Sequence, residues 1–201
     1  MAQRVEPRDS LDDFPTPPWA TRALVEHVLG NSVSELSCLE PACGRGHMAK
    51  PLAEYFNVVG SQDIADYGFG SLQDYLTYQP DRHWDWIITN PPFRMAEEFI
   101  LKARREAKVG CAFLVRTTFL ESVGRYLRLF MSDPPSIVAQ FVERVPMIKG
   151  RLDRKASTAT GYCWLVWSGY SQTATQLTWI PPCRRALENF EDYPTSTLLL
   201  I

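Results

Sequence analysis

The segment Asn90-Pro91-Pro92-Phe93 has the clearest chemical potential in the sequence. The side chain of Asn90 offers a carbonyl oxygen that accepts hydrogen bonds, and the prolines make a stiff turn because each ring fixes its φ angle. Such a turn can direct the Asn90 oxygen and a backbone carbonyl toward one point, which suits an amino group with two hydrogens. Phe93 adds an aromatic face on which a planar heterocycle can stack. A strand end followed by a helix that Asn90 caps is the alternative interpretation.

A second candidate site is the glycine loop, which runs Glu40-Pro41-Ala42-Cys43-Gly44-Arg45-Gly46. Glycines at a strand-to-helix turn let the backbone approach a ligand and adopt positive φ angles. Asp63 lies nineteen residues after Gly44, near the end of the next predicted strand. A carboxylate at that position typically accepts hydrogen bonds from ribose hydroxyls. The two features together indicate a ligand that contains adenosine.

Two other interpretations of the glycine loop remain open at this point. The spacing Gly44-x-Gly46-x-x-Ala49 also satisfies the loose dinucleotide fingerprint of nicotinamide enzymes. Short glycine motifs also occur in tight turns that bind nothing. Glu40 favours a positively charged ligand over a dinucleotide, because a carboxylate at this position would repel a pyrophosphate.

The elements that would position these segments alternate between strands and helices. The first four strands are predicted at 37–40, 58–63, 84–89 and 111–115, and the helices at 19–29, 47–56, 95–108 and 119–130. Residues 64–83 are predicted to be mostly loop, with a short element at 72–76. Two late strands, 137–142 and 162–167, have no predicted helix between them and indicate an antiparallel hairpin. The pattern predicts an α/β fold, in which helices cover both faces of a mostly parallel sheet.

The composition and charge of the chain limit what it can be. The 201 residues include 45% hydrophobic and 12% aromatic residues and carry a net charge of −2. This composition predicts one folded domain over residues 1–201 with a substantial core. Within it, residues 1–13 are predicted to form a loose N-terminal arm and residues 168–201 a C-terminal tail. The net charge excludes a surface that is basic throughout, which counts against general nucleic-acid binding.

The cysteines and the apolar segments indicate where the protein works. The five cysteines include no Cys-x-x-Cys pair, so neither a disulfide framework nor a metal site is expected. This pattern predicts a protein that works in a reducing compartment. No apolar run reaches the length of a membrane span, and the N-terminus has no apolar signal core. The sequence therefore predicts a cytoplasmic protein that does not enter a membrane.

In its combination of motifs the chain resembles the S-adenosylmethionine-dependent amino-methyltransferases, in particular the bacterial and phage DNA adenine-N6 methyltransferases. The resemblance rests on the glycine motif Glu40–Gly46 and the tetrapeptide Asn90–Phe93, and it covers roughly residues 14–118. It implies S-adenosylmethionine as the cofactor. It also implies the Rossmann-like, seven-stranded methyltransferase sheet, whose last strand is antiparallel.

The resemblance implies roles for individual residues as well. Thr16 and Pro17 resemble the segment beside the methionine end of the cofactor, Asp63 the acid that binds its ribose, and Asp74-Tyr75 the pair that contacts its adenine. The expected cofactor-binding residues are Thr16, Pro17, Glu40, Pro41, Ala42, Gly44, Gly46, Asp63, Asp74 and Tyr75. The expected catalytic residues are Asn90, Pro91, Pro92 and Phe93. Ala42 departs from the family, which often has an aromatic residue there.

A basic segment at residues 143–155, between the two late strands, is a candidate contact for DNA phosphates. A solvated loop explains this charge equally well. Arg116 follows the strand at 111–115 and is expected on the same rim as Asn90, where a phosphate, the substrate base or a structural ion pair would occupy it. The expected nucleic-acid contacts are Arg116, Lys149, Arg151, Arg154 and Lys155.

The sequence therefore predicts an enzyme that methylates the N6 amino group of adenine in DNA. The chain leaves no room for the large target-recognition domain of restriction-associated relatives, which predicts a short or relaxed target sequence. Two alternatives remain. One is a methyltransferase for an RNA base amino group or a protein glutamine amide, targets that the same tetrapeptide serves. The other is a non-catalytic scaffold that binds the cofactor.

Overall fold

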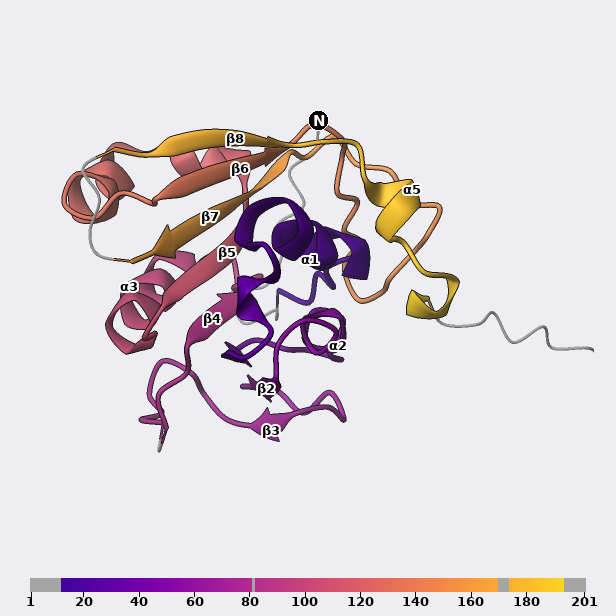
Figure 1. The fold of residues 1–201 in the computed structure, drawn as a ribbon, viewed down its shortest axis with the longest axis horizontal. Coiled ribbons are helices and arrows are strands. Elements are labelled where there is room, and N and C mark those ends of the chain that lie inside the picture. The colour runs from indigo at the N-terminus through magenta and orange to yellow at the C-terminus, as the bar shows by residue number, and fades with distance from the viewer. Residues whose placement is uncertain (1–11, 81, 170–173, 194–201) are drawn as a thin grey trace, which may run out of the picture.

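The computed structural model describes residues 12–80, 82–169 and 174–193, which form an α/β fold around one eight-stranded sheet (Figure 1). The strand order is β3-β2-β1-β4-β5-β7-β6-β8. In chain order the strands are β1 (Ser37–Glu40), β2 (Val58–Asp63), β3 (Ser71–Leu72), β4 (Trp86–Thr89), β5 (Gly110–Arg116), β6 (Ile137–Phe141), β7 (Tyr162–Ser168) and β8 (Gln176–Ile180). The predicted α/β class is confirmed.

The direction of the strands places the functional loops at one edge of the sheet. Strands β3, β2, β1, β4 and β5 are parallel to one another, whereas β7 runs antiparallel to both β5 and β6. The predicted hairpin of the two late strands is therefore confirmed, with β7 inserted between β5 and β6. The segments that follow β1, β2 and β4 all leave from the carboxyl edge, where open α/β sheets bind their ligands.

The helices differ from the prediction mainly in length. The first, predicted at 19–29, is α1 (Pro18–Leu24) continued by the π-helical η1 (Val25–Leu29), and α3 (Ala96–Glu106) matches the helix predicted at 95–108. The helix predicted at 47–56 shrinks to α2 (Ala49–Leu52). Pro51 lies inside it and has no N–H to donate. The remaining short helices are η2 (Asn31–Val33), α5 (Arg184–Leu187) and η5 (Phe190–Asp192).

The helix predicted at 119–130 is broken into three pieces. They are η3 (Thr117–Leu120), α4 (Val123–Arg125) and the π-helical η4 (Tyr126–Phe130). Ser122 causes the break: its backbone is extended, and its side chain accepts a hydrogen bond from the backbone N–H of Arg125, as an N-cap does. A new helix therefore begins where the periodicity predicts a continuous one.

Each face of the sheet carries its own hydrophobic core. Side chains of α1 and α2 pack on one face with Trp164, and side chains of α3, η3 and η4 pack on the other with Trp167. Both tryptophans lie on β7 and satisfy their indole N–H groups, Trp164 on the Ala20 carbonyl at 3.1 Å and Trp167 on the Asp133 carbonyl at 3.0 Å. Helices on both faces are thus confirmed. No helix among the described residues is long and apolar enough to cross a membrane.

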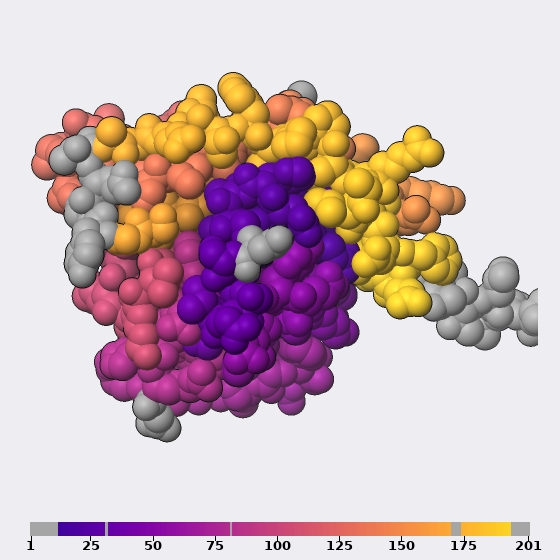
Figure 2. All heavy atoms as spheres, viewed as in Figure 1, coloured from indigo at the N-terminus to yellow at the C-terminus, as the bar shows by residue number. Residues whose placement is uncertain are grey.

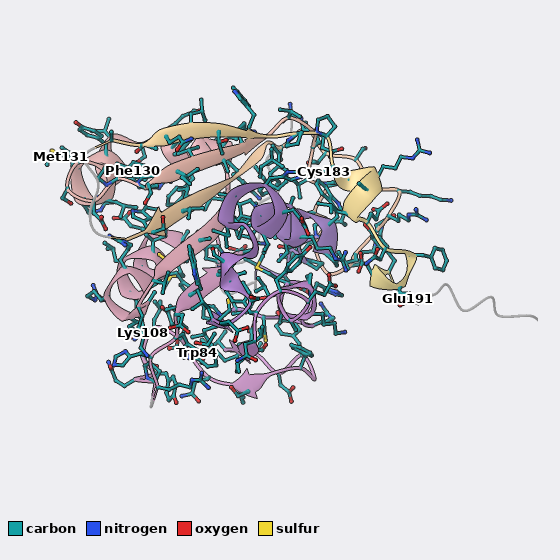
Figure 3. The ribbon with its side chains drawn as sticks, in the orientation of Figure 1. Trp84, Lys108, Phe130, Met131, Cys183 and Glu191 are labelled. Atoms are coloured by element: carbon teal, nitrogen blue, oxygen red, sulfur yellow. The ribbon has the colours of Figure 1, made fainter. Side chains whose placement is uncertain are left out.

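The C-terminal residues are more than a tail. Gln176–Ile180 forms β8, which adds an eighth strand parallel to β6. The following segment packs beside α1, as the yellow and indigo atoms show in the space-filling view (Figure 2). Cys183 lies against the body of the protein, whereas Glu191 lies at its outer margin (Figure 3). The predicted tail at 168–201 is therefore wrong for 176–192; residues 170–173 and 194–201 lie outside the described part.

Arg22 of α1 holds this segment in place. Its guanidinium donates to both carboxylate oxygens of Glu54, both oxygens of Asp192 and the Leu187 carbonyl, at 2.7–2.8 Å. The Arg22 side chain is 6% exposed and that of Asp192 is 9% exposed. Charge-assisted bonds with this geometry are strong when they are shielded from water. The C-terminal segment is thereby joined to α1 and to the end of α2.

Candidate active site

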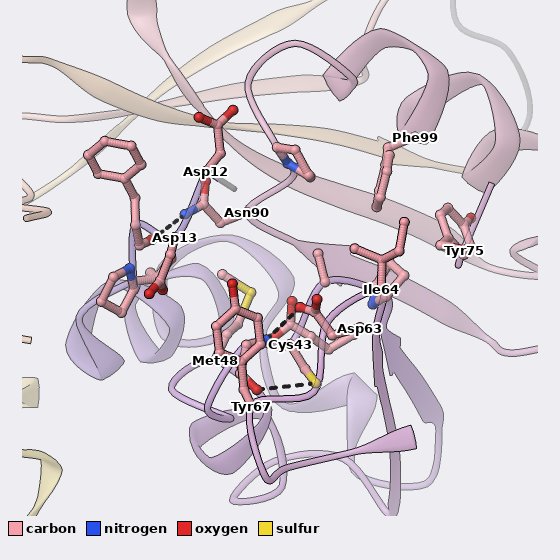
Figure 4. Close-up of a pocket in the computed structure, with 18 of the residues that line it drawn as sticks. Asp12, Asp13, Cys43, Met48, Asp63, Ile64, Tyr67, Tyr75, Asn90 and Phe99 are labelled. Atoms are coloured by element: carbon pink, nitrogen blue, oxygen red, sulfur yellow. Dashed lines mark hydrogen bonds between the residues drawn. The ribbon is translucent and has the colours of Figure 1, made fainter. Parts of the chain in front are cut away.

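A pocket of about 390 Å³ opens at the carboxyl ends of β1, β2 and β4. Its walls come from the glycine loop, the ends of β2 and β4, the start of α3 and the N-terminal segment Asp12–Thr16 (Figure 4). The pocket brings together most of the predicted site residues, namely Thr16, Glu40, Pro41, Ala42, Gly44, Asp63, Asp74, Tyr75, Asn90 and Pro92. Pro17, Gly46, Pro91 and Phe93 do not line it.

The two glycines of the glycine loop differ in their surroundings. Both have positive φ angles, 49° at Gly44 and 80° at Gly46. A Cβ atom on Gly44 would meet nothing within 4 Å, whereas one on Gly46 would lie 2.6 Å from the Phe69 ring. Gly44 therefore leaves room for a ligand, and Gly46 lets the loop pack against Phe69. This difference explains why only Gly44 borders the pocket.

Asp63 is held in a fixed orientation at the end of β2. Its two carboxylate oxygens accept hydrogen bonds from the backbone N–H groups of Gly44, at 2.8 Å, and Ala65, at 3.0 Å. A carboxylate has about four acceptor sites, so both oxygens keep capacity for further donors. Asp63 is 8% exposed and lines the pocket (Figure 4). The side chain can therefore accept two hydroxyl hydrogen bonds without moving.

Glu40 is the most deeply buried acid of the pocket, with an exposed fraction of 2%. Its pKa is raised to about 8, mainly by burial; a hydrogen bond from the Thr89 hydroxyl opposes the rise, and the charge of Asp63 adds to it. That bond spans 2.8 Å between Thr89 Oγ1 and Glu40 Oε1. Near neutral pH the carboxyl is therefore largely protonated in the free protein. A positively charged ligand in the pocket would favour its ionised form.

The Glu40→Gln variant should be more stable than the wild type at alkaline pH in the absence of ligand. Because the folded-state pKa of Glu40 lies above its unfolded value of 4.5, the folded state binds the proton more tightly. Wild-type stability therefore falls as the pH rises from 4.5 to 8. Glutamine stays neutral and avoids this loss, which is on the order of a few kcal/mol. Melting temperatures should nearly coincide at acidic pH, diverge as the pH rises from 4.5 to about 8, and then keep a constant difference. A difference that does not grow with pH would contradict a buried, protonated Glu40.

Asp74 and Tyr75 form the far wall of the pocket. The Tyr75 ring is 2% exposed and packs on the Phe99 ring, with the centroids 5.0 Å apart. The Asp74 carboxylate accepts from the Leu76 backbone N–H and the Thr77 hydroxyl, both at 3.0 Å. The turn after β3 is therefore rigid. It presents an apolar aromatic surface next to a carboxylate, a combination suited to a heterocycle with an amino group.

Asn90 presents an unused acceptor at the rim of the pocket. Its amide nitrogen donates to the Phe14 carbonyl at 3.0 Å and lies 3.6 Å from the Met147 sulfur. This donor contact orients the amide and leaves Oδ1 buried without a hydrogen-bond partner among the described residues. A buried acceptor without a partner is unfavourable by about 1–3 kcal/mol. The geometry therefore suits a ligand that donates a hydrogen bond at this position.

Phe93 is oriented by neighbours on two sides. Its backbone N–H donates to the Asp12 carboxylate at 2.9 Å, and its ring lies 5.2 Å from the Phe14 ring. The Arg116 guanidinium lies over the Phe93 ring, with its central carbon 3.9 Å from the ring centroid. The expectation that Arg116 lies on the same rim as Asn90 is met. Phe93 stays outside the pocket lining because these groups surround it.

Two parts of the site were not predicted from the sequence, apart from Thr16 in the first of them. The N-terminal segment Asp12–Thr16 lies over the Asn90–Phe93 turn and is fixed by an ion pair of 2.9 Å between Asp13 and Arg45. Met147, inside the basic loop, contacts Asn90 and Thr16 with its sulfur. Only Thr16-Pro17 signalled the first part, and nothing in the sequence signalled the second. The predicted loose arm is wrong for Asp12 and Asp13, which make these contacts; residues 1–11 lie outside the described part.

The basic segment at residues 143–155, called the basic loop below, borders the site without lining the pocket. The Gly150 backbone N–H donates to the Asp13 carbonyl at 2.7 Å, which brings the loop to the N-terminal segment. Arg151 is exposed and lies 3.4 Å from Asp153, and Arg154 forms an ion pair of 3.1 Å with Glu188. Lys149 and Lys155 are also exposed. Among the predicted nucleic-acid contacts, Arg116 lies next to the Asn90–Phe93 turn, and Arg154 is directed toward the C-terminal segment.

Comparisons with known proteins agree with this architecture. No protein-family model and no curated protein matches the sequence. Among solved structures, a candidate RNA methyltransferase from Pyrococcus horikoshii has a TM-score of 0.61 and 16% identity, over 82% of this chain and 91% of that protein. A candidate class I S-adenosylmethionine-dependent methyltransferase from Listeria monocytogenes has a TM-score of 0.57 and 14% identity over 82% of this chain. The modification subunit of a candidate type I restriction enzyme from Vibrio vulnificus has a TM-score of 0.57 and 17% identity over 84%.

These similarities establish the fold. The chain spans 65% of the Listeria protein and 46% of the Vibrio subunit, so each of those proteins contains more than this chain matches. The structure of this chain agrees with these similarities in its strand order, its antiparallel β7 and its pocket at the carboxyl edge of the sheet. The chain therefore has the Rossmann-like fold of the class I S-adenosylmethionine-dependent methyltransferases.

Proposed function

We propose that this protein transfers a methyl group from S-adenosylmethionine to the N6 amino group of adenine in DNA. The observation that carries this proposal is the buried Asn90 Oδ1, an acceptor without a partner among the described residues, at the rim of a pocket. An exocyclic amino group would satisfy this acceptor with one of its hydrogens. The target sequence in DNA is short or relaxed, because the basic loop supplies phosphate contacts and few groups that read base edges.

The residues of the pocket fit the proposed cofactor. Gly44 leaves open space beside the loop, Asp63 has free acceptor sites for ribose hydroxyls, and Tyr75 offers an apolar wall for an adenine ring. Glu40 is a buried carboxyl with no ion pair to a described residue, so a positively charged ligand would stabilise its ionised form. When bound, S-adenosylmethionine supplies an electrophilic methyl group on a positively charged sulfur. A volume of about 390 Å³ is within the range of small-molecule sites.

The catalytic turn would act on the nitrogen of the substrate. Asn90 Oδ1 accepts one amino hydrogen, and a backbone carbonyl of the proline turn accepts the other. Both contacts withdraw the nitrogen lone pair from conjugation with the ring and make it more nucleophilic. The Phe14 carbonyl holds the Asn90 amide in the orientation that this step requires. No separate general base is needed, because the proton can leave to solvent after the methyl group has been transferred.

DNA is the preferred substrate class because of the charges around the site. The fold does not decide this, since it is shared by the modification subunit of a candidate type I restriction enzyme and by a candidate RNA methyltransferase. Arg116 lies beside the catalytic turn, and Lys149 and Arg151 belong to a loop that reaches the N-terminal segment of the site. Cations in these places suit a phosphate backbone that passes the pocket.

The proposed function is tested with labelled S-adenosylmethionine and three substrate mixtures: DNA, RNA and protein. After the reaction, the nucleic acids are digested to nucleosides and the protein to peptides. N6-methyladenine from DNA is the expected product, and sequencing of the modified sites should show a target of only a few bases. Methylation confined to RNA or to a glutamine amide would overturn the assignment to DNA. Binding of the cofactor without turnover on any substrate would indicate a scaffold.

The Asp63→Ala variant should weaken binding of S-adenosylmethionine roughly 10- to 100-fold, because ribose hydroxyls would lose a charged acceptor. Isothermal calorimetry measures the affinity directly, and the ligand-induced rise in Tm reports it independently. Asp66→Ala is the matched control, since Asp66 is exposed and, among the described residues, accepts only from the Gly68 backbone N–H. Equal affinities in the two variants would remove Asp63 from the cofactor site. A response to NAD but not to S-adenosylmethionine would refute the proposed function.

A further inference from the structure

Arg116, at the end of β5, covers the aromatic face of Phe93 on which the proposed reaction would stack a base. Its guanidinium carbon lies 3.9 Å from the Phe93 ring centroid and 6.0 Å from the Phe14 ring centroid. Both rings adjoin Asn90, because the Phe14 carbonyl holds the Asn90 amide and Phe93 belongs to the same turn. A base that stacks on this face of Phe93 while its amino group reaches Asn90 Oδ1 would collide with Arg116.

The guanidinium of Arg116 does not use all of its hydrogen-bond donors. Its Nε is buried and has no hydrogen-bond partner among the described residues. A buried N–H group without an acceptor is unfavourable. A phosphate offers the acceptor geometry that a guanidinium fork matches best. Arg116 can therefore exchange its contact with Phe93 for a phosphate that is delivered to the rim.

We propose that Arg116 covers the base-stacking face of Phe93 until the target adenine enters and then moves to a phosphate of the flipped nucleotide. This inference rests on the proposed function, because it takes a DNA base as the substrate. The exchange replaces a guanidinium–aromatic contact with base–aromatic stacking. The released cation then gains a phosphate partner.

The exchange would give the site a preference for adenine within a DNA strand. A free nucleoside must also displace Arg116 from Phe93, but it brings no phosphate to accept the released cation. A nucleotide in DNA brings that phosphate with it. Arg116 is thus a specificity-determining residue, which disfavours free adenine nucleosides and favours the polymer.

Two ligands separate the two parts of this exchange. They are deoxyadenosine, which has no phosphate, and a short DNA duplex with one mismatched adenine, which is easily flipped. Affinities are measured by calorimetry on the full chain saturated with S-adenosylhomocysteine. Arg116→Ala should bind deoxyadenosine roughly 5-fold more tightly than the wild type, since nothing has to leave Phe93. It should bind the duplex roughly 5- to 10-fold more weakly at low salt, with a slope of log K against log salt smaller by about one.

Two further variants complete the test. Arg116→Lys keeps the charge without the planar guanidinium and should retain the wild-type salt dependence on the duplex. Arg128→Ala is the matched control, because Arg128 is exposed, pairs with Glu97 and does not line the pocket. It should change neither affinity. All variants are first compared by thermal melting, so that a folding defect is recognised.

The outcomes distinguish the two proposals. An unchanged affinity of Arg116→Ala for deoxyadenosine would overturn the exchange, and so would a change of the same sign with both ligands. Either result would leave the proposed function in place if the wild type still methylates DNA. A wild-type protein that binds neither ligand and methylates no DNA would overturn both proposals.

Discussion

The Asn90→Ala variant should lose roughly 10²- to 10³-fold in kcat for DNA methylation, the loss typical of removing one precisely oriented hydrogen-bonding group that acts on the reacting centre. Its affinity for S-adenosylmethionine should stay within about twofold of the wild type, because Asn90 is proposed to act on the substrate nitrogen and other residues hold the cofactor. The alanine removes the buried Oδ1 acceptor along with the amide that donates to Phe14. Single-turnover kinetics separates the loss in the chemical step from any loss in binding.

Asn57→Ala provides the matched control for this experiment. Asn57 is exposed and precedes β2, so it lies at the amino edge of the sheet, opposite the pocket. Its replacement should leave both turnover and cofactor affinity unchanged. Thermal melting of both variants in the presence and absence of S-adenosylmethionine verifies that each is folded. Wild-type turnover by Asn90→Ala would refute the acceptor mechanism.

The Arg22→Met variant should be destabilised by about 3 kcal/mol, equivalent to a decrease in Tm of roughly 6–12 °C for a domain of this size. Methionine fills much of the same space but leaves the Asp192 carboxylate, 9% exposed, without its cation. The Leu187 carbonyl would also lose its donor. Removal of one partner from a buried ion pair leaves an uncompensated charge, and this is the main source of the destabilisation.

Hydrogen exchange would show where the destabilisation acts. Amides of α5 and η5 should exchange faster in Arg22→Met, because Arg22 joins these helices to α1. Arg128→Met is the control: Arg128 forms an ion pair with Glu97, but its side chain is 63% exposed, so its loss should leave Tm nearly unchanged. Similar effects of the two variants on Tm would show that Arg22 does not hold the C-terminal segment.

Local signals in the sequence were sufficient for the central strands of the sheet and for the two motifs. Strand β1 is predicted with its observed bounds, and β4 and β5 to within two residues. The continuous apolar run at 111–115 is typical of a parallel strand that is buried on both faces. The turn after β4 and the glycine loop after β1 follow from proline and glycine chemistry within a few residues. Parallel strands then bring these loops to one edge. The sequence thus determined that the two motifs meet at one edge of the sheet, whereas the structure decided that Gly46, Pro91 and Phe93 do not line the pocket.

Contacts between distant residues were decided only by the tertiary structure. Asn90 is oriented by Phe14, 76 positions away, and lies against Met147, 57 positions away. No local sequence pattern predicts such a contact, because it forms only when the fold brings distant segments of the chain to the same edge of the pocket. Strand β8 escaped prediction for a related reason: it is an edge strand with Leu177 and Trp179 largely exposed, so its alternation lacks a buried face. It pairs with β6, which β7 separates from β5, and this spatial order of the strands exists only in the folded sheet.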